Sequence, residues 1–161
     1  ADALHVPMDL LLVRKLGVPW QPELAFGAIA EGGGRVIHET FGLRPEQVER
    51  VVAAEQAELE RRAYVFRGNK PPAEVKGRTV LLVDDGLATG ATMEAGVRAL
   101  RQAGAGKIVV AVPVGPSDTC RALQREADEV ICLEQPEPFD AVGAWYEDFH
   151  QMTDEEVRVL L

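Results

Sequence analysis

Four short apolar runs constrain the fold of this chain more than any other feature of its sequence. They are Asp9–Arg14, Thr79–Val83, Lys107–Val112 and Glu129–Leu133, and the last three are rich in β-branched residues. Runs of this length are too short for a typical helix, and apolar side chains on both faces are typical of strands buried in a parallel sheet. The sequence therefore predicts four parallel strands.

Helix-like segments separate the last three runs. Thr92–Ala103 stops before Gly104, and Ser117–Ala127 begins with two residues that can cap a helix. A succession of strand, helix, strand, helix and strand implies right-handed crossovers. The predicted fold class is therefore α/β, with a parallel sheet flanked by helices.

Two segments interrupt this alternation. Glu23–Ile37 is divided by the turn Gly32–Gly34, a pattern that indicates a hairpin or a bent strand. Pro45–Phe66 has proline at its first position and apolar residues at helical intervals, which predicts one long helix. With 161 residues, the chain has the length of one domain, so we expect a single domain over residues 1–161.

Charge and hydropathy exclude several classes of partner. The formal net charge is −9, which repels nucleic-acid backbones and argues against general nucleic-acid binding. The apolar runs are far shorter than the roughly 18–20 residues that a membrane-spanning helix needs, and the first residues carry no secretory pattern. We therefore expect a cytoplasmic protein without a membrane partner. Cys120 and Cys132 are widely spaced, which suggests structural roles and neither a disulfide framework nor a zinc site.

The segment Val80–Thr92 carries the clearest chemistry. An apolar strand ends in Asp84 and Asp85, and a loop of small residues then leads into a helix. The carboxyl ends of parallel strands face the crevice where α/β proteins bind ligands. Backbone amides at a helix N-terminus can hold a phosphate at Ala88–Thr92. The two carboxylates can accept hydrogen bonds from sugar hydroxyls or hold a divalent cation, so a phosphorylated ribose satisfies both halves.

An acid pair after an apolar strand also fits a receiver-like signalling domain, in which such acids hold Mg²⁺ beside a phosphoacceptor aspartate. That interpretation needs an aspartate at the end of a neighbouring strand. Neither Lys107–Val110 nor Val112–Val114 provides one, and the acid pair leads into Thr89-Gly90-Ala91-Thr92, so the phosphate-loop interpretation is favoured.

These thirteen residues resemble the binding motif for 5-phosphoribosyl 1-pyrophosphate (PRPP) of the type I phosphoribosyltransferases. Further segments, among them Pro22–Ile29 and Pro138–Phe149, are similar to bacterial phosphoribosyltransferases of unassigned base specificity. The resemblance implies that Asp84 and Asp85 hold the 2- and 3-hydroxyls of the ribose and that Ala88–Thr92 cradles the 5-phosphate. It also implies a parallel sheet flanked by helices, with a small additional lobe called the hood.

The resemblance gives roles to basic and aromatic residues as well. Arg14 and Lys15 would lie against the pyrophosphate, although a charged strand end is the commoner meaning of such a pair. Trp145 and Tyr146 would offer an aromatic face to the nucleobase, or simply pack in the hood. The implied catalytic residues are Asp84, Asp85, Arg14 and Lys15. The implied substrate-binding residues are Asp84, Asp85, Gly86, Ala88, Thr89, Gly90, Ala91, Thr92, Trp145 and Tyr146.

Two departures from the family qualify this expectation. Ala88 stands where the 6-oxopurine enzymes carry an aspartate, which disfavours guanine and hypoxanthine as substrates. The family also opens with a strand and a pyrophosphate-binding loop, and no such segment precedes Asp9. We therefore expect the domain to be N-terminally incomplete, without its first strand and pyrophosphate loop.

The activity that the resemblance implies is transfer of the 5-phosphoribosyl group from PRPP to a nitrogenous base with release of pyrophosphate. Mg²⁺ is the implied cofactor, held near Asp84 and Asp85 directly or through the ribose hydroxyls. The implied partners are PRPP and a small base or nucleoside monophosphate, and a homodimer is a further expectation. A non-catalytic sensor of PRPP or nucleotides on the same fold is the alternative.

Overall fold

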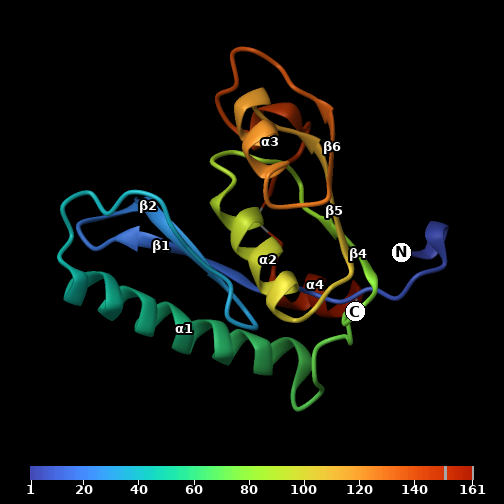
Figure 1. Ribbon diagram of the computed structural model, residues 1–161, viewed down its shortest axis with the longest axis horizontal. Coiled ribbons are helices and arrows are strands. Elements are labelled where there is room, and N and C mark those ends of the chain that lie inside the picture. Colours follow the sequence, from blue (N-terminus) through green and yellow to red (C-terminus); the bar gives the residue numbers. More distant parts are fainter. Residues whose placement is uncertain (151, 161) are drawn as a thin grey trace.

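The computed structural model describes residues 1–150 and 152–160, and over these residues it forms two three-stranded sheets that enclose one helix (Figure 1). The first sheet is antiparallel and contains β1 (Val13–Val18), β2 (Gln21–Ala30) and β3 (Arg35–Ile37). The second is parallel, in the order β4 (Thr79–Val83), β5 (Lys107–Val114) and β6 (Glu129–Glu134). Helix α2 (Ala91–Gln102) lies between them.

The parallel sheet confirms the predicted alternation of strands and helices. Val80 is paired with Ile108, and Val110 with Val130. The crossovers contain α2 and α3 (Ser117–Leu123). Helix α3 ends before the predicted Ala127 because its last turn tightens, with the Glu126 amide donating to Leu123 O. The core here includes Leu87, Met93, Val97, Leu100, Ile108, Val110, Val112, Cys120 and Leu123.

The antiparallel sheet and the long helix α1 (Pro45–Arg67) form the hood. The predicted hairpin is confirmed as β2 and β3, and the predicted long helix as α1. Leu16, Phe26 and Leu59 are almost completely buried where α1 packs on β1 and β2. In Figure 1, α1 runs along one side of β1 and β2.

The predicted parallel strand at Asp9–Arg14 is wrong in its bounds and its pairing. Strand β1 begins at Val13 and pairs antiparallel with β2. The physical reason is the short turn at Pro19 and Trp20, which brings the chain straight back beside itself, and adjacent strands joined this way are antiparallel. Residues 9–12 precede the strand without belonging to it.

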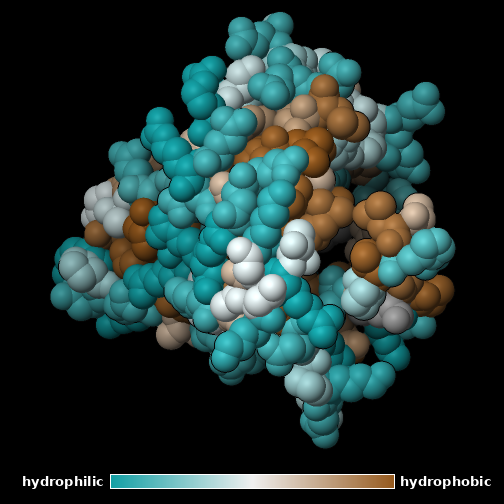
Figure 2. Space-filling model, turned by 45° about the vertical axis from the view of Figure 1, so that its right-hand side comes forward, coloured by the Kyte–Doolittle hydropathy of each residue, from teal (hydrophilic) through white to brown (hydrophobic). Residues whose placement is uncertain are grey.

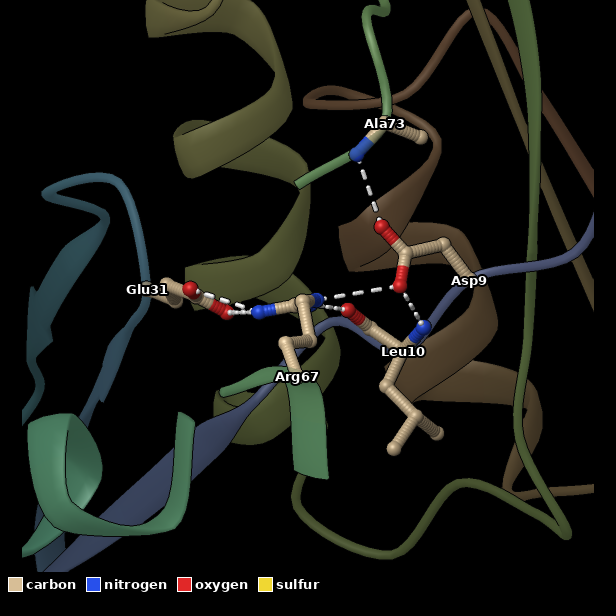
Figure 3. A network of polar contacts seen from close by, with 5 residues as sticks. All are labelled: Asp9, Leu10, Glu31, Arg67 and Ala73. Atoms are coloured by element: carbon tan, nitrogen blue, oxygen red, sulfur yellow. Dashed lines mark hydrogen bonds and ion pairs between the residues drawn. The ribbon is translucent and has the colours of Figure 1, made fainter. Parts of the chain in front are cut away.

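Arg67, the last residue of α1, ties the hood to the segment that precedes β1 (Figure 3). Its guanidinium donates to both Glu31 carboxylate oxygens (2.6 and 2.7 Å), to Asp9 Oδ1 (3.1 Å) and to the main-chain oxygen of Leu10. Asp9 also accepts from the Ala73 amide (2.7 Å). The Arg67 side chain is only 8% exposed, so these partners replace the water that it loses.

One face of the parallel sheet remains open. Side chains alternate along β4 and β6, so Leu82 and Val130 pack on the core while Leu81, Val83, Ile131 and Leu133 point the other way. Val83 is 64% exposed and Leu133 is 73% exposed. Figure 2, in which this side of the molecule turns toward the viewer, shows hydrophobic surface gathered beside a hollow.

The remaining helical elements are short: η1 (Asp2–Leu4), η2 (Val142–Trp145) and α4 (Asp154–Leu160). Among the residues that the structure describes, no helix has the length and apolar character needed to cross a membrane.

Candidate functional site

The connection between β4 and α2 carries the predicted acid pair and the predicted phosphate loop. Asp84 and Asp85 follow Val83 at the carboxyl end of β4, and α2 starts at Ala91 after the N-cap residue Gly90. Gly90 has φ of 79°, a left-handed conformation that favours glycine. The structure thus places both halves of the predicted site on one short loop.

The two carboxylates lie close enough to influence one another. Asp84 Oδ1 accepts a hydrogen bond from the Asp85 amide (3.0 Å). Desolvation by surrounding protein atoms raises the pKa of Asp84 above its ordinary value, and the charge of Asp85 adds to this, against the Asp85 amide and the charge of Lys15. Desolvation likewise raises the pKa of Asp85, and Lys15 again opposes it. An added cation or a set of hydroxyl donors would relieve this unfavourable electrostatic environment.

The two predicted basic residues lie on opposite sides of β1. The charge of Lys15 acts on both Asp84 and Asp85. Arg14 faces α1 instead, where its Nε donates to Glu55 Oε2 at 2.7 Å. Alternation of side chains along a strand explains the difference. Lys15 is thus near enough to the acid pair for its charge to lower both pKa values, whereas Arg14 is engaged in the hood.

The parallel sheet and α3 support the predicted phosphate loop, residues 88–92, and Leu87 just before it. Leu87 is buried, and its amide donates to Val114 O at 2.9 Å. Thr119 Oγ1 donates to the main-chain oxygen of Ala88 at 3.0 Å. Within the described ranges, no side chain caps the N-terminus of α2, so the amides of its first turn are available to bind an anion. Ala88 and Thr89 are exposed to solvent.

Sequence reasoning missed Leu87 and Thr119 as supports of this loop. The apolar Leu87 stands out among small residues, and Thr119 belongs to a polar cluster that follows Pro116. Both patterns were visible, but only the fold shows that α3 lies against the loop.

Residues 142–149, which we call the clasp, lie against the acid pair from the C-terminal side. Tyr146 Oη donates to the main-chain oxygen of Asp85 at 2.6 Å. The Tyr146 and Phe149 rings are 5.2 Å apart between centroids and tilted by 39°. Trp145 is 48% exposed. The structure thus brings Tyr146 to the acid pair, and it leaves much of the Trp145 surface open to solvent.

A recess of about 250 Å³ adjoins the site between the segment before β1 and β4. Its lining includes Asp84 and Thr92 together with the apolar residues Leu11, Leu12, Val13, Leu82, Val83 and Met93. Within the described part of the chain, no cluster of three or more histidine, cysteine or acidic side chains could hold a metal ion by itself. Two adjacent carboxylates fit Mg²⁺ only when a ligand supplies further oxygens, as is usual for this ion.

Two curated proteins and one solved structure are similar to this chain. The "Putative phosphoribosyl transferase Rv0571c" of Mycobacterium tuberculosis H37Rv and the "Putative phosphoribosyl transferase MT0597" of strain CDC 1551 are each 46% identical over 165 aligned positions. The alignment covers 100% of this chain but 37% of each relative, so the chain spans little more than a third of their length. The crystal structure of TT1426 from Thermus thermophilus is similar, with a TM-score of 0.79 and 42% identity, over 99% of this chain and 77% of that one.

A family model described as phosphoribosyl transferase domain matches residues 13–147. The match begins at β1 and ends in the clasp, and it therefore includes Lys15, the acid pair, the phosphate loop and Tyr146. On this evidence, the chain belongs to the phosphoribosyl transferase domain family.

Proposed function

We propose that this chain binds PRPP together with Mg²⁺ and transfers the 5-phosphoribosyl group to a nitrogenous base, with release of pyrophosphate. The family and the relatives support a general role in phosphoribosyl transfer. The observation that carries the finer proposal is the placement of an acid pair, an anion-binding loop and Lys15 around one strand end.

Each part of the site would meet a different part of PRPP. Asp84 and Asp85 would accept hydrogen bonds from the two ribose hydroxyls, which would offset the desolvation that raises their pKa values. The amides of Ala88–Thr92, the hydroxyls of Thr89 and Thr92 and the positive end of α2 would hold the 5-phosphate. Lys15 would face the pyrophosphate as a positive charge. Catalysis would rest on positioning and charge stabilisation rather than on a protein nucleophile.

Mg²⁺, when bound, would neutralise charge on the departing pyrophosphate. Asp84 and Asp85 are the residues that would hold it, directly or through the ribose hydroxyls. The acceptor base is less defined, since Ala88 offers no side chain for proton exchange and disfavours 6-oxopurines by the resemblance. The roles of Arg14 and Trp145 at a ligand, and a homodimer, stay predictions.

Calorimetry with PRPP and Mg²⁺ tests the binding half of this proposal. We expect Asp84→Asn with Asp85→Asn to weaken binding by at least about tenfold, because hydrogen bonds to charged groups are lost. The matched control is Glu46→Gln with Glu60→Gln, which removes the same charge from the exposed side of α1. Equal affinity in the wild type and the Asp84/Asp85 variant would contradict the assignment.

A PRPP or nucleotide sensor is the second candidate, and one observation favours it. Arg14 is engaged by Glu55, so only one of the two predicted cations faces the acid pair, which limits stabilisation of the departing pyrophosphate. Pyrophosphate release measured across a panel of free bases separates the two candidates. Release that depends on a base supports the transferase, whereas tight binding of PRPP without release supports the sensor.

A further inference from the structure

The clasp contacts residues 84–87, which we call the acid loop, through the backbone of this loop rather than through its carboxylates. Tyr146 Oη donates to the main-chain oxygen of Asp85 at 2.6 Å. That oxygen belongs to the peptide unit between Asp85 and Gly86, so the hydrogen bond fixes the orientation of this peptide plane. The backbone orientation at Asp85 in turn determines where its carboxylate can point.

A second contact of the clasp lies one residue further along. A Cβ added to Gly86 would stand 2.7 Å from Val142 Cγ1 and 3.0 Å from Val114 O, so the Gly86 backbone is enclosed between the clasp and β5. Within the clasp, the Phe149 ring packs against Tyr146 and lies over Gly143. The Tyr146 ring therefore packs against Phe149 on one side, and its hydroxyl is held by a hydrogen bond.

The loop is anchored differently at its two ends. Toward α2, Leu87 and Ala88 are held by hydrogen bonds to Val114 and Thr119. Toward β4, the Asp85 carbonyl is held by Tyr146, from an element that lies sixty-one residues further along the chain. The phosphate half of the loop thus depends on the sheet and α3, and the acid half depends on the clasp.

We propose that Tyr146 is a positioning residue, which holds the Asp85 backbone so that both carboxylates are aligned for the ribose hydroxyls before the ligand arrives. This inference rests on the proposed function of the acid pair. A loop ordered in advance loses less conformational entropy when the ligand binds, and so binds more tightly. The role differs from base stacking, because Tyr146 acts through Asp85 and needs its hydroxyl.

Tyr146→Phe removes only that hydroxyl, and Tyr64→Phe is a matched control. Tyr64 is the other tyrosine of the chain, lies on α1 and is 65% exposed. Hydrogen exchange of amides 84–87 reports on the acid loop without any ligand. We expect exchange there to be about 3- to 10-fold faster in Tyr146→Phe and unchanged in Tyr64→Phe, the range expected for one lost hydrogen bond.

Calorimetry supplies the second measurement, with two probes. We expect Tyr146→Phe to weaken binding of PRPP with Mg²⁺ by about 3- to 10-fold and to leave binding of inorganic phosphate unchanged, because the phosphate loop has its own anchors. A general loss of stability would weaken both probes alike. In steady-state assays the same change is expected to raise KM for PRPP more than it lowers kcat.

The outcomes separate this inference from the proposed function. Unchanged amide exchange in Tyr146→Phe would overturn the claim that Tyr146 holds the Asp85 backbone, whichever ligand the site binds. Faster exchange with unchanged PRPP affinity overturns the positioning role. If the wild type binds no PRPP, the proposed function is wrong and so is alignment for ribose hydroxyls, while the exchange measurement still decides whether Tyr146 holds the loop.

Discussion

At the scale of single residues, neighbours in the sequence can have unrelated roles. Arg14 and Lys15 carry the same charge one position apart, yet Arg14 pairs with Glu55 on α1 and Lys15 acts on the acid pair. From the sequence, both residues were predicted to lie against the pyrophosphate of PRPP. Successive side chains of β1 point to opposite faces of the strand, and this decides which of the two can reach a ligand at Asp84 and Asp85.

We therefore expect Lys15→Met and Arg14→Met to differ. Lys15→Met removes positive charge beside the acid pair, so the pKa values of Asp84 and Asp85 should rise further and PRPP affinity should fall by roughly tenfold. Arg14→Met should change PRPP affinity by less than about threefold, because this change breaks only the ion pair with Glu55 in the hood. Calorimetry at constant ionic strength measures both, and equal losses would contradict this division of roles.

At the scale of elements, α2 packs against both sheets because the side chains on its two faces differ in size. Ala91, Ala95 and Ala99 pack on Ala28, Ala30 and Val36 of the hood. Larger residues of α2 such as Met93, Val97 and Leu100 pack on the parallel sheet. The alanine face permits a close approach of the turn between β2 and β3, where Gly34 lies directly against the α2 backbone.

Gly34→Ala and Gly96→Ala test this packing as a pair. A Cβ at Gly34 would collide with Ala95 O and stand 2.8 Å from the Ala99 amide nitrogen, and backbone cannot move aside, so we expect a loss of about 1–3 kcal/mol or more. A Cβ at Gly96 would meet only the ends of the Leu11 and Leu82 side chains, at 3.1 and 3.3 Å. That change also improves helix propensity, so we expect stability within about 1 kcal/mol of the wild type.

Urea unfolding followed by circular dichroism measures both variants. If Gly34→Ala were as stable as Gly96→Ala, the close contact between the hairpin turn and α2 would not be a constraint on this fold.

At the scale of the whole molecule, the sequence predicted local elements better than it predicted their partners. The strands Thr79–Val83, Lys107–Val112 and Glu129–Leu133 were recognisable because each is a short apolar run between turns. The acid pair and the predicted phosphate loop could be proposed from the sequence because their residues are contiguous. The pairing of β1 was not predictable from an apolar run, since the run does not reveal its neighbour.

Contacts between distant segments were also beyond the sequence. Tyr146 was a candidate for its ring, whereas the structure shows a hydroxyl that reaches the Asp85 backbone. Arg67 follows the predicted helix Pro45–Phe66 and had no predicted role, whereas its side chain is nearly buried and joins Asp9, Leu10 and Glu31 (Figure 3). Each of these contacts depends on how whole elements are packed, and no local pattern encodes them.

We expect the Arg67 cluster to make the stability of the whole molecule depend on pH. Burial alone would raise the pKa of Asp9, but hydrogen bonds from the Ala73 amide and from Arg67 outweigh it and hold the pKa below its ordinary value. Because the pKa of Asp9 is lower in the folded state than in the unfolded state, its contribution is fully present above the unfolded value of about 3.9 and is lost as pH falls through the folded value.

The expected result is a stability difference between the wild type and Asp9→Asn that is present at pH 7 and shrinks below about pH 4. Asparagine keeps an acceptor for the Ala73 amide but removes the charge that faces Arg67. Arg67→Met should be the more damaging variant, by about 1–3 kcal/mol at pH 7, because it leaves both Asp9 and Glu31 without their partner. Urea unfolding of the three proteins between pH 3 and pH 7 measures these differences. A gap between wild type and Asp9→Asn that stayed constant over this range would show that the charge of Asp9 does not hold the hood to the segment before β1.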